Sequence, residues 1–163
     1  MSEGSAQGGE EMKKIGEYTA RGQLTENESE ASDGVRITLF DGRFDTAYRV
    51  TSFRIWGSDW SGSTTPDVIG KLATVRGLSD AAADFMNAGD QREIAWAGGN
   101  GASDLLIVGD SIIDPDNMVV EDLFIYARGA TDTADVNYLI TMDKYDITDW
   151  QGALAMVRNR AQG

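Results

Sequence analysis

The chain has 163 residues, of which 41% are hydrophobic, so it is long and apolar enough to form one domain with its own core. It contains no cysteine and no histidine, which excludes disulfides, thiolate metal sites, and the usual histidine base and zinc ligands. The formal net charge is −13, so we expect no direct binding to nucleic acid, which is itself a polyanion.

The choice of charged residues indicates a saline medium. The acidic residues are 18 Asp and 9 Glu, whereas the basic ones are 10 Arg and 4 Lys. Dense, hydrated carboxylates keep a protein soluble in salt water, where ions screen their mutual repulsion, so we expect a marine or otherwise saline source. Residues 1–10 have neither a basic region nor an apolar core, and no apolar run is long enough to cross a bilayer. We therefore expect neither a signal peptide nor a membrane span.

Residues 1–33 differ in composition from the rest of the chain. They hold eight acidic side chains against three basic ones, with many Gly and Ser and few apolar residues. Low hydrophobicity combined with like charge predicts a flexible acidic arm. Met12 and Ile15 are apolar exceptions, and we expect them to contact a neighbouring subunit. Order is expected to begin near Val35, and residues 34–163 are expected to form a single domain.

Two strands are predicted at the start of this domain. Val35–Leu39 alternates apolar and polar residues, the turn sequence Asp41-Gly42 follows, and Ala47–Trp56 is again rich in β-formers. This order predicts a hairpin. Strict alternation places Trp56 on the same face as Tyr48 and Val50, so we expect Trp56 in the core.

The middle of the chain predicts short elements. Strands are expected over residues 67–76, 92–97 and 105–108, and Trp96 is expected in the core. Residues 78–87 contain an alanine-rich run after Ser79 and Asp80, which favours a short crossover helix. The glycine-rich segment 98–101 lacks the basic residue of a phosphate loop and is interpreted as a turn.

The last third of the chain is the richest in β-formers. Residues 118–128 and 136–147 are two long apolar strands around a polar turn, and they predict a second hairpin. A helix is expected over residues 148–160, because Trp150, Leu154 and Val157 fall on one apolar stripe. This stripe is a second candidate contact with a neighbouring subunit, and Trp150 could equally belong to the core. The whole pattern predicts an all-β antiparallel sandwich, jelly-roll-like, with a crossover helix and a C-terminal helix.

Two loops carry an alternative, ligand-binding interpretation. Trp60 follows Asp59 in a Ser- and Gly-rich loop, where an aromatic face beside a carboxylate would suit a sugar. Asp114 and Asp116 resemble part of a calcium loop, although the remaining ligands of an EF-hand are missing. Turn formation by Asp is the simpler interpretation, so Ca²⁺ stays the one cofactor considered. With 27 acidic residues some carboxylate pair is always available, so no pair indicates an enzyme.

The segments 121–126, 137–145 and 150–160 together resemble virion proteins of the capsid type from marine phages or archaeal viruses. This resemblance implies a non-enzymatic structural protein that self-assembles, located in the virion after assembly in the host cytoplasm. Its partners would be copies of itself and other virion proteins. An acidic arm would not line a packaged genome, because arms that condense nucleic acid are basic. The alternative is a β-sandwich module that binds carbohydrate or depends on calcium.

Overall fold

The computed structural model describes residues 12–25, 34–39, 45–58, 68–76, 78, 86–99, 111–129 and 135–147. This described part contains eight strands and no helix. The strands are β1 (Met12–Leu24), β2 (Val35–Ile37), β3 (Thr46–Gly57), β4 (Val68–Ala73), β5 (Glu93–Gly99), β6 (Ile112–Ile113), β7 (Leu123–Gly129) and β8 (Val136–Ile147). No helix among the described residues is long and apolar enough to cross a membrane.

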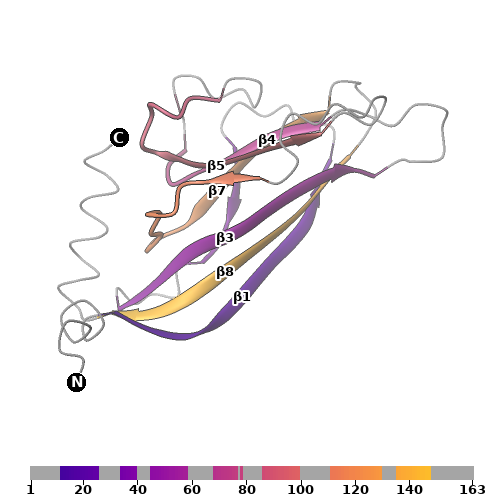
Figure 1. Ribbon diagram of the computed structural model, residues 1–163. Helices are drawn as coiled ribbons and strands as arrows, with labels where there is room; N and C mark the ends of the chain where they lie inside the picture. The colour runs from indigo at the N-terminus through magenta and orange to yellow at the C-terminus, as the bar shows by residue number, and fades with distance from the viewer. Residues whose placement is uncertain are drawn as a thin grey trace.

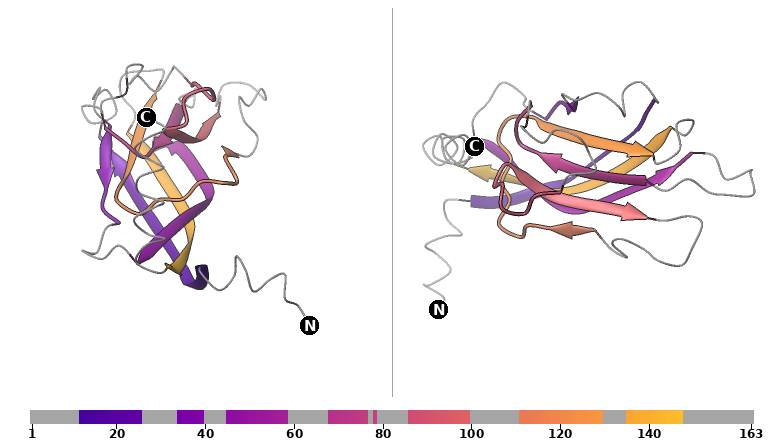
Figure 2. Two further views of the ribbon diagram at one scale, coloured as in Figure 1. Left: turned by 90° about the vertical axis from the view of Figure 1, so that its left-hand side faces the viewer. Right: turned by 90° about the horizontal axis from the view of Figure 1, so that it is seen from above.

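The strands form two antiparallel sheets that lie one over the other (Figure 1; Figure 2). One sheet has the order β1-β8-β3 and the other has the order β2-β7-β4-β5-β6. The expectation of an all-β, sandwich-like chain of antiparallel strands is confirmed. The predicted strands over residues 67–76 and 92–97 correspond to β4 and β5.

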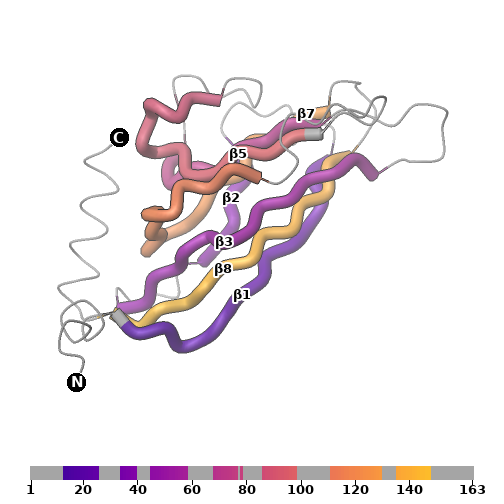
Figure 3. Tube along the Cα trace, in the orientation of Figure 1, coloured from indigo at the N-terminus to yellow at the C-terminus, as the bar shows by residue number. Residues whose placement is uncertain are grey.

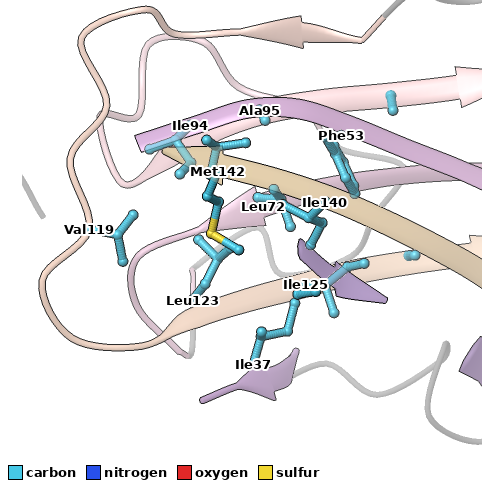
Figure 4. Packing of buried hydrophobic residues seen from close by; sticks show 14 of the residues in the cluster. Ile37, Phe53, Leu72, Ile94, Ala95, Val119, Leu123, Ile125, Ile140 and Met142 are labelled. Carbon is cyan, nitrogen blue, oxygen red and sulfur yellow. The ribbon is translucent and has the colours of Figure 1, made fainter. Parts of the chain in front are cut away.

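Side chains from both sheets meet in one apolar core between the layers (Figure 4). Phe53 and Ile140 face it from the three-stranded sheet, and Leu72, Leu123 and Ile125 face it from the five-stranded sheet; all five are fully buried. At roughly 25 cal/mol per Å² of apolar surface removed from water, such side chains supply the main driving force for stacking the sheets.

Both predicted hairpins are wrong. β2 pairs with β7, and β3 pairs with β8, so β2 and β3 lie in different sheets. The consecutive strands β7 and β8 are likewise separated between the two sheets. Residues 38–45 connect β2 to β3, and residues 130–135 connect β7 to β8. These connections are longer than a two-residue turn, and this length lets the chain cross from one sheet to the other.

The prediction that order begins near Val35 is also wrong. Residues 12–24 of the predicted flexible arm form β1, which pairs with β8 from Met12 opposite Ile147 to Leu24 opposite Val136. An edge strand needs apolar residues only on the face that meets the core, and here Ala20 and Leu24 are the buried ones. Several residues on that face are small, and for this reason the composition of the segment did not predict a strand. Residues 1–11 and 26–33 lie outside the described parts.

A β-bulge corrects the predicted position of Trp56. The pairing of β3 with β8 shifts between Val50 and Ser52, which leaves Thr51 as the extra residue. Tyr48 and Val50 face the core before the bulge, and Phe53 faces it afterwards. Trp56 therefore points away from the core, and it is 40% exposed. Trp96 was also predicted in the core, but it lies opposite Lys71 on the side of the five-stranded sheet that faces away from the core, where it is partly buried.

The remaining predicted elements fall mostly outside the described residues. Of the predicted crossover helix, the described residues Leu78, Met86 and Asn87 are not helical, and residues 79–85 are not described. The predicted strand over residues 105–108 and the predicted helix over residues 148–160 lie entirely outside the described parts.

Candidate interaction surface

The predicted calcium ligands Asp114 and Asp116 lie in a turn that follows β6. Asp114 Oδ1 accepts a hydrogen bond from the backbone N–H of Asp116 at 3.0 Å, and the Asp114 carbonyl accepts the Asn117 side-chain amide at 2.7 Å. Asp114 therefore shapes the turn, as Asp does at such positions. Among the described residues, no group of three acidic side chains is arranged to hold a metal ion.

The turn places the side chain of Asn117 against the edge of β3. Its side-chain oxygen accepts the N–H of Val50 at 2.8 Å, and its side-chain nitrogen donates to the carbonyl of Val50 at 3.1 Å. One buried amide thus satisfies both backbone groups of Val50 on the outer edge of β3. Residues on either side of Asn117 also bond to the edge of β3. Ser111 Oγ accepts the N–H of Phe53 at 3.3 Å, and Val119 forms a β-bridge with Tyr48. Residues 111–119 therefore cover the edge of β3.

The other predicted site residues are not brought together in the described structure. Ile15 lies in β1 and is 51% exposed, and it is the residue without a partner in β8 where the register shifts between Lys14 and Gly16. Met12 is the first residue of β1, and its side chain is not described. The remaining predicted contact and ligand residues lie outside the described parts; they are Asp59, Trp60, Trp150, Leu154 and Val157.

A different surface emerges on the three-stranded sheet. Apart from the irregularities at Ile15 and Thr51, every second residue of β1, β8 and β3 points away from the core, and these residues align in rows across the strands. We call this surface the outer face. Its rows are Gln23, Asn137 and Trp56; Arg21, Leu139 and Arg54; Thr19, Thr141 and Ser52; and Glu17, Asp143 and Arg49.

One end of the outer face has its charges paired. Lys14 Nζ lies 3.1 Å from Asp143 Oδ1 and 3.4 Å from Glu17 Oε2. The hydrogen bond to Asp143 raises the pKa of Lys14. The guanidinium of Arg49 lies 5.5 Å from the ring centroid of Tyr145. Charge and aromatic surface are therefore already engaged at this end.

The opposite end of the outer face presents unpaired cations. Arg21 and Arg54 flank Leu139, and both are exposed. Among the residues that the structure describes, no carboxylate lies within ion-pair distance of either arginine. The exposed Trp56 lies beside Asn137, which accepts a hydrogen bond from Gln23 at 3.0 Å. In a chain of net charge −13, two unpaired arginines beside an exposed tryptophan are suited to a partner surface.

The edge of β1 borders the outer face. In Figure 1 and Figure 3, β1 is the outermost strand of its sheet. No other described strand pairs with its outer side, although β1 is 13 residues long. The other three sheet edges in the described part are short or covered, because β2 has three residues, β6 has two, and residues 111–119 cover β3. An edge of this length that no described strand covers is a ready template for another strand.

A buried ion pair on the five-stranded sheet is the strongest alternative site. Lys71 Nζ lies 2.9 Å from Glu93 Oε2, and both side chains are fully buried. The other oxygen of Glu93 accepts hydrogen bonds from the Asn87 backbone and the Trp96 indole, each at 2.9 Å. The ammonium of Lys71 also lies 5.6 Å from the ring centroid of Tyr126. Because water does not reach either charge, we interpret the pair as structural rather than catalytic.

Neither protein-family models nor curated proteins provide a relative of this chain. The fold and the surface of the three-stranded sheet are therefore the observations that bear on function.

Sequence reasoning missed this surface. Its signal was the pair of motifs Arg21-x-Gln23 and Arg54-x-Trp56, in which large polar and aromatic residues occupy every second position of a strand. Recognising the first motif required treating residues 12–24 as a strand. Recognising the second required knowing that a bulge shifts the face of β3.

Proposed function

We propose that this chain is a non-enzymatic structural subunit that assembles with copies of itself, of the type found in viral capsids or associated with virions. The observation that carries the proposal is the order of the strands. β1 pairs with β8, β2 with β7, and β4 with β5, so the chain resembles one long hairpin folded over on itself. Nesting of this type is typical of a jelly roll, an architecture used by capsid proteins and by lectins.

The covered edge of β3 supports the jelly-roll interpretation. In a fully nested arrangement the sixth strand would lie against the third. Here β6 pairs with β5, while Ser111 and Asn117 on either side of it bond to Phe53 and Val50 of β3. The segment 111–119 thus lies where the missing pair would be and links the two sheets.

The surface supports self-assembly more than catalysis. In the described part of the chain, no strand pairs with the outer side of β1 and no carboxylate pairs with Arg21 or Arg54, and both features suit contact with a neighbouring subunit. The acidic character of the chain suits contact with protein rather than with a genome. Other virion proteins are further candidate partners, and the virion is the proposed location.

Light scattering coupled to size exclusion tests the proposal directly. The full-length protein is measured over a range of concentrations, in low salt and in roughly molar salt, where screening removes most repulsion between acidic subunits. We expect a discrete oligomer whose fraction increases with salt. We also expect electron microscopy of the producing host to show particles. A strict monomer at high concentration in both salts would refute the proposal.

A second candidate function is a ligand-binding sandwich, and the exposed Trp56 favours it. A flat aromatic surface beside the amides of Gln23 and Asn137 has the chemistry to hold a sugar ring. Glycan-array binding that is lost in Trp56→Ala would support this function. Trp60→Ala separates it from the loop site predicted from the sequence, and calcium titration of the melting temperature tests Asp114 and Asp116. Absence of both signals would leave self-assembly as the remaining proposal.

A further inference from the structure

We infer that the open edge of β1 pairs antiparallel with the same edge of a second copy, with Thr19 facing Thr19 across a two-fold axis. This inference rests on the proposed self-assembly and specifies its first contact. The two three-stranded sheets would join into one continuous sheet of order β3-β8-β1-β1-β8-β3. An interface in which the same surface meets itself is the commonest form of homodimer.

The protection of this edge is confined to one end of the strand. Lysines and bulges are devices that discourage edge pairing, and here Lys13, Lys14 and the irregularity before Gly16 provide both. From Gly16 to Leu24 the register with β8 is regular, so no bulge interrupts this part of the edge where a neighbouring strand would pair. The unprotected part contains the charged residues Glu17 and Arg21.

These two charges select a single register. Residues that oppose each other in an antiparallel ladder lie on the same face, and Glu17, Thr19, Arg21 and Gln23 all lie on the outer face. A two-fold centred on Thr19 places Glu17 opposite Arg21 twice. A two-fold centred on Tyr18 or on Ala20 places Glu17 opposite an uncharged residue. Centring on Glu17 or on Arg21 places like charges together.

The exposure of both charges favours the same register. Arg21 has no carboxylate partner among the described residues. The side chain of Glu17 is 76% exposed, and its contact with Lys14 is long at 3.4 Å. The dimer would give each of these groups an opposite charge directly across the ladder, and the Thr19 pair on the axis could share a hydrogen bond.

The inward-facing residues are complementary in size in this register. Tyr18 would lie opposite Ala20, and Gly16 opposite Gly22. Tyr18 is 42% exposed at the edge, although its ring already lies 5.9 Å from that of Tyr48. A large side chain opposite a small one lets the ring of Tyr18 extend the core across the interface without a clash.

Charge exchange tests the register. Glu17→Arg and Arg21→Glu each place two pairs of like charges in the interface, and each variant should weaken dimerisation about tenfold or more in sedimentation velocity at low salt. The double variant Glu17→Arg/Arg21→Glu restores opposite charges and should dimerise like the parent. Because both side chains are exposed, each variant should keep a single cooperative melting transition like that of the parent, which excludes loss of the fold. Equal weakness of the double variant would overturn the register.

A cysteine on the two-fold axis provides an independent measurement. The chain has no cysteine, so Thr19→Cys introduces a single thiol, and oxidation should link two copies. Gln23→Cys, also on the outer face, lies opposite Ile15 in this register and should stay monomeric on a denaturing gel. Linking of Gln23→Cys but not Thr19→Cys would refute the inference.

The outcomes separate this inference from the proposed function. If the parent oligomerises while neither charge variant changes its mass and Thr19→Cys fails to link, the subunits assemble through another surface and only the β1 pairing fails. If the parent is monomeric in every concentration and salt, both fail.

Discussion

Lys71 and Glu93 form the most deeply buried ionic contact described in this protein, on the side of the five-stranded sheet that faces away from the central core. The carboxylate of Glu93 accepts three hydrogen bonds, from Lys71, the Asn87 backbone and the Trp96 indole. A buried charge is tolerated only when it is paired and hydrogen-bonded. The pair therefore links β4 to β5, and removal of either charged group alone should lower the free energy of unfolding.

Lys71→Met should lower the free energy of unfolding by roughly 3–5 kcal/mol, because it leaves the charge of Glu93 buried without a counter-ion. Urea unfolding at pH 7 measures the change. The double variant Lys71→Met/Glu93→Gln removes both charges and keeps an oxygen for Asn87 and Trp96, so it should recover most of the loss. If the single variant proves as stable as the parent, our interpretation of the pair as structural is wrong.

The ion pair between Asp90 and Arg92 should make the stability of the fold depend on pH. A side-chain hydrogen bond from Arg92 lowers the pKa of Asp90, so the folded state binds this proton less tightly than the unfolded state does. The contribution to stability is therefore complete above the unfolded pKa, near 3.9, and is lost as pH falls through the lowered folded value. Asp90→Asn should cost about 0.5–1 kcal/mol at pH 7 and progressively less below about pH 4. A constant difference between parent and variant from pH 7 to pH 3 would contradict this assignment.

At the scale of single elements, β1 is the strand whose role differs most from expectation. It supplies one edge of the three-stranded sheet, and its Leu24 lies opposite the fully buried Val136 of β8. Removal of β1 would expose the core side of β8 to water and create a new sheet edge. The acidic composition of residues 1–33 as a whole therefore did not prevent β1 from being part of the folded domain.

A chain that begins at residue 26 should be less stable than the parent by more than about 3 kcal/mol, or should aggregate, because it loses β1 and the apolar surface that Leu24 and Ala20 bury. Thermal unfolding followed by circular dichroism measures the loss. A chain that begins at Met12 is the matched control, and it should unfold like the parent. Equal stability of the two shortened chains would show that β1 contributes nothing to the domain.

The bulge at Thr51 acts on a whole element as well. Because of the bulge, the side chains of the second half of β3 point to the opposite faces from those that strict alternation predicts. Phe53 therefore lies in the core and Trp56 lies on the surface. The hydroxyl of Thr51 bonds to Thr141 of the neighbouring strand at 3.1–3.2 Å, which fastens the extra residue on the outer face. The candidate surface thus depends on one inserted residue.

At the scale of the whole molecule, the net charge of −13 opposes compaction and association. Salt shortens the range of this repulsion to about 10 Å at 0.1 M. We expect the melting temperature to rise by several degrees between about 0.01 M and 0.5 M NaCl, as screening relieves the repulsion. Differential scanning calorimetry at pH 7 measures the shift.

Asp116 and Asp146 provide the control, since both are exposed. The variant Asp116→Asn/Asp146→Asn carries less negative charge, so it should melt higher than the parent at low salt and gain less from added salt. A salt response that is the same in both proteins would mean that specific ion binding, rather than net charge, causes the shift.

The sequence alone determined the local character of this protein. Alternation of apolar and polar residues predicted β2, and runs rich in β-formers predicted β3, β4, β5, β7 and β8, since both signals depend only on neighbours in the chain. The missing cysteines and histidines, and the acidic charge, limited the chemistry without any structure. These properties are local or additive, and so composition and spacing reveal them.

The tertiary structure decided which strands are neighbours and which side chains share a surface. Alternation marks Arg21 and Arg54 as strand residues, but only the pairing of β1 and β3 with β8 brings them to either side of Leu139. β1 became recognisable only through its pairing with β8, because half of the residues on its core-facing side are small and bury little surface by themselves. Strand pairing reflects the free energy of burying both sheets together, which depends on contacts between residues far apart in the chain. No local pattern contains that information.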